Sequence, residues 1–274
     1  RRRGDRRGGP GRTAVNGTSA RTRAILGAGG VLTSLAVWEL LPRLGLVNPD
    51  YFPPFSVVVA TLVERAAGDA LWVALGQTLV TWLTGLAIAT AAGLGIGLLI
   101  GSSPVARRFT SSTIEFLRPI PSVALIPLAV LMFGTRMGST LLLVVYAAFW
   151  QVLVQVLYGV VDVDPLQRDM ARSYRFGRRA VLGKIVFPVV LPYALTGFRL
   201  AASVALVLTI TGELIIGTPG IGQLIAQART AGATEVMYAL VLVAGLLGVA
   251  VNLGMRTVER KLLPWHPSVR VAAA

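Results

Sequence analysis

The sequence contains no cysteine and only one histidine, His266. Without cysteine the chain can form no disulfide, no thiolate metal site and no cysteine nucleophile. A single histidine also argues against a metal site built from several histidines and against a Ser-His-Asp triad. We therefore expect no catalytic residues and no metal site.

Charged residues are also scarce. They make up 14% of the 274 residues, whereas 54% are hydrophobic and the mean hydropathy is +0.71. Water-soluble domains carry about 25% charged residues. A soluble enzyme and a nucleic-acid-binding domain are therefore not expected, in spite of the net charge of +14. The composition favours an all-α polytopic membrane protein.

Six apolar stretches are long enough to cross a bilayer as helices, which takes about 20 residues. They are residues 24–47, 71–100, 115–133, 139–160, 185–216 and 235–255. Glu39 and Arg43 interrupt the first stretch near its end. We expect one transmembrane domain over residues 24–262, between a disordered basic tail at 1–23 and a second tail at 263–274.

The basic residues indicate how the chain is oriented in the membrane. If the N-terminus is cytoplasmic, the inner segments hold 20 Lys and Arg and the outer segments hold four. Cytoplasmic loops of membrane proteins carry such an excess. We therefore expect a multi-pass protein of the inner (plasma) membrane with both termini in the cytoplasm.

Glycine recurs at every fourth position in the second stretch, as Gly93, Gly97 and Gly101. A stripe of small residues lets two helix backbones approach closely in lipid. We favour a packing role, although glycine is in any case common in membrane helices.

The composition changes abruptly over residues 161–184. Asp164 is a suitable N-cap and Pro165 suits the first helical position, which predicts a helix from Pro165 to about Arg175. Such a helix has an apolar edge, formed by Leu166, Met170, Ala171 and Tyr174. A helix this short needs a partner to bury that edge, or else it lies on lipid headgroups. The residues favour these two interpretations equally.

This segment resembles the EAA loop of ABC importer permeases. The family pattern is Glu-Ala-Ala, three residues, Gly, nine residues and Ile-x-Leu-Pro. The matching residues here are Asp169, Met170, Ala171, Arg175, Ile185, Phe187 and Pro188, without gaps. Arg175 departs from the pattern because it stands where the family has glycine, and we expect Gly177 to take over the turn. After it, residues 178–187 are expected to start a second helix that leads into the fifth apolar stretch, with a local break at Pro188.

Two further stretches resemble the nitrate/sulfonate/taurine-type branch of that family. They are residues 118–128, continuing to Phe133-Gly134, and residues 213–225. The segment from Trp265 to Ser268 is also similar to this branch. The resemblance covers about residues 25 to 270, which is nearly the whole chain.

The resemblance implies a type I ABC importer permease fold of six transmembrane helices with a cytoplasmic coupling helix in segment 161–184. It implies a second permease subunit, identical or different, together with two ATPase subunits and an external solute-binding protein. ATP and Mg would bind the ATPase, because this chain has no Gly-x-x-x-x-Gly-Lys-Ser/Thr loop and is expected to bind no cofactor.

The residues implied in coupling to the ATPase are Asp169, Met170, Ala171, Arg172, Tyr174, Arg175, Gly177, Ile185 and Pro188. Met170 and Ala171 would contact the ATPase, and Asp169 or Arg172 would fix the register. Arg175 would either influence the choice of partner or face lipid.

The residues expected near the translocation path are Pro119, Pro121, Trp150, Gln151 and Glu213. Prolines break a span, and irregular backbone is tolerated at membrane depth mainly where it is buried or lines a cavity. For Glu213 we favour a structural role, as an ion pair with Arg199 or with a residue of a second subunit.

The function implied by the resemblance is import of a small organic or inorganic anion, of the sulfonate, taurine or nitrate type. One alternative is the same class of importer carrying a vitamin precursor, riboflavin or an aromatic acid. Another is a secondary transporter, which should show inverted repeats and ion-coupling acids within the membrane. The sequence has no convincing repeat.

Overall fold

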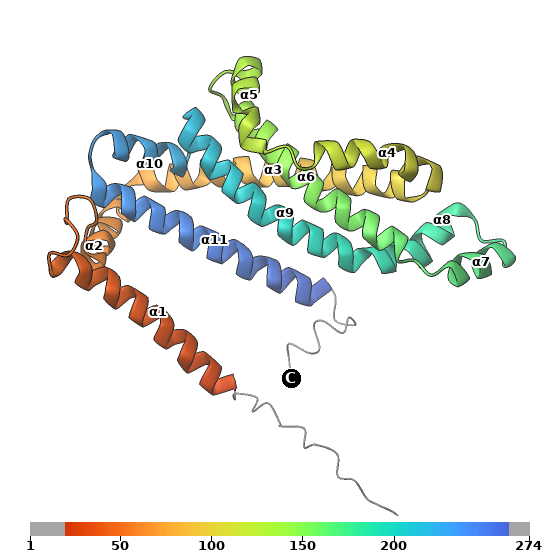
Figure 1. The fold of residues 1–274 in the computed structure, drawn as a ribbon, viewed down its shortest axis with the longest axis horizontal. Coiled ribbons are helices and arrows are strands. Elements are labelled where there is room, and N and C mark those ends of the chain that lie inside the picture. The colour runs from red at the N-terminus through yellow and green to blue at the C-terminus, as the bar shows by residue number, and fades with distance from the viewer. Residues whose placement is uncertain (1–19, 263–274) are drawn as a thin grey trace, which may run out of the picture. The chain divides into compact units, whose positions relative to one another are not determined.

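The structure is a computed structural model that describes residues 20–262, and over that range every regular element is a helix. The helices, most of them labelled in Figure 1, are α1 (Ala20–Arg43), α2 (Phe55–Ala66), α3 (Asp69–Gly101), α4 (Pro104–Leu117), η1 (Ser122–Leu125), α5 (Ile126–Phe133), α6 (Met137–Val161), α7 (Pro165–Ser173), α8 (Arg178–Val181), η2 (Leu182–Val186), α9 (Phe187–Ile216), α10 (Ile221–Thr230) and α11 (Thr234–Leu262). The described residues fall into two compact units that divide between Ser56 and Val57.

The first unit consists of α1 and the chain that follows it to Ser56. Trp38 of α1 packs on Phe52 and Phe55, with ring centroids 5.6 and 5.4 Å apart. Glu39 accepts a hydrogen bond from Arg43 Nε at 2.6 Å, and also from the backbone N–H and the hydroxyl of Ser56, both at 2.8 Å. The two charges that interrupt the first apolar stretch therefore pair with each other.

Among the described residues, five helical runs are long and apolar enough to span a membrane. They are Ile25–Arg43, Asp69–Gly101, Met137–Val161, Arg179–Ile216 and Thr234–Leu262. The predicted third span, residues 115–133, is not one helix. It includes the end of α4 and continues through η1 and α5. These two parts form a bent pair whose axes differ by 81°, and the pair counts as a sixth span if it crosses as a unit.

The glycine stripe of α3 packs against valines of α6. Added Cβ atoms on Gly93, Gly97 and Gly101 would lie 2.8, 2.7 and 2.9 Å from Val152, Val156 and Val160, respectively, which is too close for any side chain. The prediction of close helix contact is confirmed. Residue numbers in these contacting pairs rise together in both helices, so α3 and α6 run parallel. The chain between them must therefore cross the membrane in the opposite direction. We infer that α4, η1 and α5 form one broken span.

The remaining spans alternate in direction. Gly197 of α9 lies against Gln151 of α6, and Gly212 lies against Thr140, so these two helices are antiparallel. Arg199 of α9 pairs with Glu259 of α11 at 3.2 Å, near the end of α11, so α11 runs opposite to α9. The C-terminal ends of α6 and α11 therefore lie on one side, and Figure 1 shows α7 and α8 beyond that end of α6.

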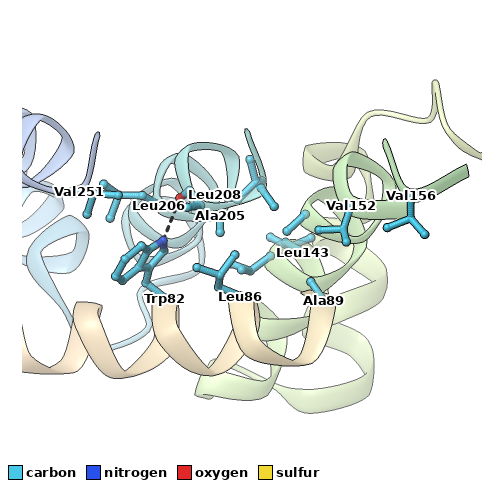
Figure 2. Close-up of a cluster of buried hydrophobic side chains, with 14 of the residues drawn as sticks. Trp82, Leu86, Ala89, Leu143, Val152, Val156, Ala205, Leu206, Leu208 and Val251 are labelled. Atoms are coloured by element: carbon cyan, nitrogen blue, oxygen red, sulfur yellow. Dashed lines mark hydrogen bonds between the residues drawn. The ribbon is translucent and has the colours of Figure 1, made fainter. Parts of the chain in front are cut away.

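The core lies where α3, α6 and α9 meet, and its side chains are almost all aliphatic (Figure 2). Trp82 of α3 is the large exception. Its indole Nε1 donates a hydrogen bond of 2.9 Å to the carbonyl oxygen of Ala202 in α9. A buried tryptophan N–H needs such a partner, and here the bond also ties two spans together.

Candidate coupling segment and translocation path

The coupling segment begins with a capped helix. The Oδ1 atom of Asp164 accepts a hydrogen bond of 2.8 Å from the backbone N–H of Leu166, and Pro165 is the first residue of α7. A side-chain acceptor at the N-cap satisfies one of the free N–H groups of the first turn. The predicted start of this helix is confirmed.

The end of α7 explains the residue that departs from the family pattern. Arg175 has φ +53°, which is the left-handed region that glycine adopts without strain. The N–H of Phe176 then reaches back to the carbonyl oxygen of Ala171 at 2.9 Å, as in a Schellman motif. The expectation that Gly177 takes over the turn is wrong, because the reversal occurs at Arg175 and Gly177 keeps an ordinary φ.

The apolar edge of α7 divides into an exposed and a buried part. Met170 is 53% exposed, and Leu166 and Tyr174 are also exposed. Ala171 is only 3% exposed, because it packs within this chain. Ala171 was expected to contact the ATPase, but it is already covered in the isolated chain. Met170 and Leu166 are therefore the apolar side chains on α7 that are free to contact a partner.

Two side chains were expected to fix the register of a partner. Asp169 is exposed on α7, whereas the side chain of Arg172 lies outside the described part of the structure. A further contact was not expected from the sequence. The hydroxyl of Tyr193 in α9 donates to Asp162 Oδ2 at 2.9 Å, so the start of the coupling segment is tied to a membrane span.

The second half of the coupling segment joins α9 through a π-helical turn. This turn is η2, which contains half-buried Ile185 and ends next to Phe187. Pro188 follows in the first turn of α9. A proline inside a helix removes one backbone hydrogen bond and crowds the carbonyl four residues earlier, and a wider turn relieves that crowding. The structure therefore has the local break that Pro188 predicts.

The break in the third span lies between Leu117 and Ser122 and includes Pro119 and Pro121, which are both exposed. The hydroxyl of Tyr146 in α6 donates to the carbonyl oxygen of Leu117 at 2.6 Å. This bond satisfies a carbonyl at the end of α4 and fixes the break against α6. The two prolines thus sit on irregular backbone, as the sequence suggests.

Trp150 and Gln151, expected near the path, point in different directions from α6. The buried ring of Trp150 packs on Tyr146, with centroids 5.9 Å apart, and its Nε1 has no partner among the described residues. The backbone of Gln151 instead lies against Gly197 of α9. Trp150 therefore belongs with the break of the third span, and Gln151 with the contact between α6 and α9.

Glu213 is fully buried and holds three elements together. Its Oε2 atom accepts hydrogen bonds from Thr78 Oγ1 at 2.9 Å and from the N–H of Gly222 at 3.0 Å. Thr78 Oγ1 in turn accepts a hydrogen bond of 2.9 Å from the backbone N–H of Ile221. The two residues cap the first turn of α10 and join it to α3 and α9. The structure supports the structural role, but Arg199 is not the partner, because it pairs with Glu259.

Glycines around Glu213 make this contact possible. Gly220 has φ +155°, and a Cβ on it would collide with the Glu213 carboxyl group. A Cβ on Gly222 would collide with the carbonyl oxygen of Ile210. The Gly-x-Gly at the start of α10 is therefore needed so that the turn can lie directly on α9. Nothing in the sequence around Glu213 indicates that Thr78, 135 residues earlier, completes the cluster.

The geometry defines a bundle of membrane spans with a short ordered helix outside it. The described residues contain no group of acids and histidines suited to a metal ion. Residues 93–264 match the family model for the binding-protein-dependent transport system inner membrane component, so the chain belongs to that family of ABC transporter permeases.

Individual relatives agree with the family assignment. The taurine transport system permease protein TauC of Escherichia coli (strain K12) is 32% identical over 89% of this chain and 91% of its own length. The putative aliphatic sulfonates transport permease protein SsuC of Bacillus subtilis (strain 168) is 29% identical over 85% of each chain. A solved structure of the MetNI methionine ABC transporter, in an inward-facing conformation, shares the fold with a TM-score of 0.59 and 17% identity, over 73% of this chain and 95% of that one.

Several conclusions follow from the family. The chain is a multi-pass inner-membrane permease subunit of a binding-protein-dependent ABC importer, without catalytic activity and without a cofactor of its own. Such an importer includes an ATPase and a solute-binding protein as partners.

Proposed function

We propose that this permease, paired with a second permease subunit, forms the path for a small anion of the sulfonate, taurine or nitrate type. Two relatives named for taurine and aliphatic sulfonates support this solute class. Along the sequence, Glu115 is also the only acid in residues 104–137, which include the break of the third span, and so few acids there suit an anion. A vitamin precursor, riboflavin or an aromatic acid is the alternative solute.

We propose further that α7 is the contact with the ATPase. The observation that carries this is the exposure of Met170 and Leu166 on a helix that is capped at both ends. A preorganised helix loses little further conformational entropy on docking. ATP-driven closure of the ATPase pair would press the two α7 helices together and switch the path from inward-facing to outward-facing, as a rigid-body change.

The orientation of the bundle follows from this arrangement. With α7 in the cytoplasm, the end of α11 is cytoplasmic too, because both lie at the same end of the bundle. The excess of Lys and Arg in segments 1–23, 161–184 and 256–270 supports the same orientation.

Co-purification of the ATPase with variants of Met170 tests the coupling contact. Met170→Glu places a charge where an apolar surface is needed, and it should reduce the recovered ATPase at least tenfold. Met170→Leu keeps the apolar surface and should recover the wild-type amount. Because Met170 is exposed, both variants should keep the wild-type melting temperature. Equal recovery with both would mean that α7 is not the ATPase contact.

The solute class is tested on the solute-binding protein of this importer. Its melting temperature should rise with taurine, alkanesulfonates or nitrate and not with riboflavin or aromatic acids. A rise only with the second group would replace the proposed solute class with the alternative.

A further inference from the structure

The break in the third span lies deep in the membrane-spanning bundle. The carbonyl of Leu117, the last residue of α4, accepts a hydrogen bond from Tyr146. Tyr146 is the tenth of the 25 residues of α6. At about 1.5 Å per residue, the break therefore lies about 14 Å from the start of a helix that is about 37 Å long. The irregular backbone between α4 and η1 is thus at the level of the hydrocarbon core.

Irregular backbone at this depth cannot face lipid. Its polar groups would lack partners there, so such segments occur where they are buried in protein or line water. In this chain Arg118, Pro119, Pro121 and Ala124 are exposed. Since residues 57–262 of the described structure leave this side of the break uncovered, we take it to face either a second subunit or a water-filled path.

The charge of Arg118 favours the water-filled path over the second subunit. It sits at the C-cap of α4, is exposed, and takes no part in the ion pairs of the described residues, Arg43–Glu39 and Arg199–Glu259. Its guanidinium is always charged, and the nearest acid along the helix is Glu115, one turn earlier. A charged side chain at membrane depth faces a water-filled cavity or a counter-charge, and it marks a functional site.

A second donor lies beside the break. Trp150, one turn along α6 from Tyr146, is 8% exposed, and its Nε1 has no hydrogen-bond partner among the described residues. Indole Nε1 can only donate, and guanidinium likewise only donates. Arg118 and Trp150 can therefore each donate a hydrogen bond to an acceptor but cannot accept one.

We propose that Arg118 is an anion-binding residue of the translocation path, which holds the oxyanion group of the passing solute at the break of the third span. A guanidinium binds a sulfonate, nitrate or carboxylate through two parallel hydrogen bonds. Because Arg118 is exposed, the bound anion would be held weakly and could leave the site readily. This inference rests on the proposed function, because it assigns the residue that would favour an anion over a cation in that path.

The absence of cysteine allows a test that does not depend on the solute. Ala124, exposed on the far side of the break, is changed to cysteine as the single thiol in the permease, and the whole importer is assembled in vesicles. Rates of modification are compared for an anionic methanethiosulfonate reagent, the ethylsulfonate, and a cationic one, the ethyltrimethylammonium.

With Arg118 present, the anionic reagent should be favoured. Arg118→Gln should lower the ratio of anionic to cationic rates about 25-fold, because one charge about 4 Å away in water changes each rate about fivefold, in opposite directions for the two reagents. Arg118→Lys should keep the ratio, and Arg108→Gln, at the other end of α4, should leave it unchanged. An unchanged ratio in Arg118→Gln, or an introduced thiol that neither reagent reaches in any nucleotide state, would overturn the proposal.

Uptake of a labelled anion separates this inference from the proposed function. If the wild-type importer takes up taurine, methanesulfonate or nitrate, Arg118→Gln should raise the KM for uptake at least tenfold while the ATPase still co-purifies, and Arg118→Lys should fall between. Wild-type uptake that Arg118→Gln leaves unchanged would remove only the role of Arg118. A wild-type importer that takes up none of these anions would overturn the solute class, and the anion role with it.

Discussion

Single residues set the shape of the coupling segment and of the turn before α10. Arg175 occupies a left-handed position where a side chain is strained, and the reversal there lets Phe176 reach the carbonyl of Ala171. Glu213 and Thr78 satisfy two N–H groups that would otherwise be buried without acceptors. At Arg175 the hydrogen bond offsets backbone strain, and at α10 the hydrogen bonds offset the cost of burying two N–H groups.

Arg175→Gly should stabilise the coupling segment, because glycine removes the strain of the left-handed position, worth about 1 kcal/mol. The greater conformational entropy of glycine in the unfolded chain offsets part of this gain. Hydrogen exchange over residues 165–177 should slow by up to about fivefold. Ser173→Gly, inside α7, is the matched control and should speed exchange. Faster exchange in Arg175→Gly would contradict the assigned turn.

Thr78→Val should destabilise the protein by about 1–3 kcal/mol, because the buried N–H of Ile221 and the carboxyl of Glu213 both lose a partner. Thermal unfolding in detergent measures the loss. Thr257→Val is the control, since its exposed hydroxyl bonds only a carbonyl of its own helix. If the two variants unfold at the same temperature, the cluster around Glu213 does not contribute to stability.

Elements pack through side chains of matched size, and the α3–α6 contact shows this most simply. The helices run parallel, and glycines at every fourth position of α3 each meet a valine of α6. Hydrophobic burial does not drive helix association in lipid, so close packing of this kind is the main source of affinity between spans.

Gly97→Val should disrupt that contact, because its Cβ would lie 2.7 Å from a methyl group of Val156. Overpacking of this kind costs about 1–3 kcal/mol or more. Gly95→Val, two residues away with nothing within 4 Å, is the matched control and should be tolerated. The yield of monodisperse protein and its melting temperature report the difference, and equal values would mean that the stripe is not a packing surface.

The parallel course of α3 and α6 requires that α4, η1 and α5 cross the membrane. Single thiols at Ser103→Cys, before α4, and Thr135→Cys, after α5, should react with an impermeant maleimide from opposite sides of the membrane. Thr135→Cys should be the one labelled from outside. Labelling of both from the same side would make the bent pair a re-entrant loop and leave five spans.

Much of the element scale could be predicted from the sequence, because its signals are local. The glycine spacing, Asp164 with Pro165, and Pro188 each act within a few residues or one helix face. Other features could not be predicted, since each depends on residues brought together from different helices. They are the burial of Ala171, the hydrogen-bond partners of Glu213, and the pairing of Arg199 with Glu259 instead of Glu213. The sequence shows that Arg175 departs from the family pattern, but only the backbone shows that the chain still reverses at Arg175 and not at Gly177.

At the scale of the whole molecule, the chain is one subunit of an importer whose energy comes from a separate ATPase. The described residues supply candidate membrane spans, a bent helix pair with an exposed arginine, and a short ordered helix beyond one end of the bundle. These three parts fit a mechanism in which force enters at α7 and access to the path changes at a distance.

ATP-dependent uptake by the complete importer in proteoliposomes tests this account most directly. With binding protein outside and ATP inside, wild-type vesicles should accumulate a labelled sulfonate or nitrate. Vesicles with Met170→Glu should not, although that permease is folded, and neither should vesicles without ATP. Uptake driven by a proton or sodium gradient in the absence of ATP, or full uptake by Met170→Glu, would contradict the account.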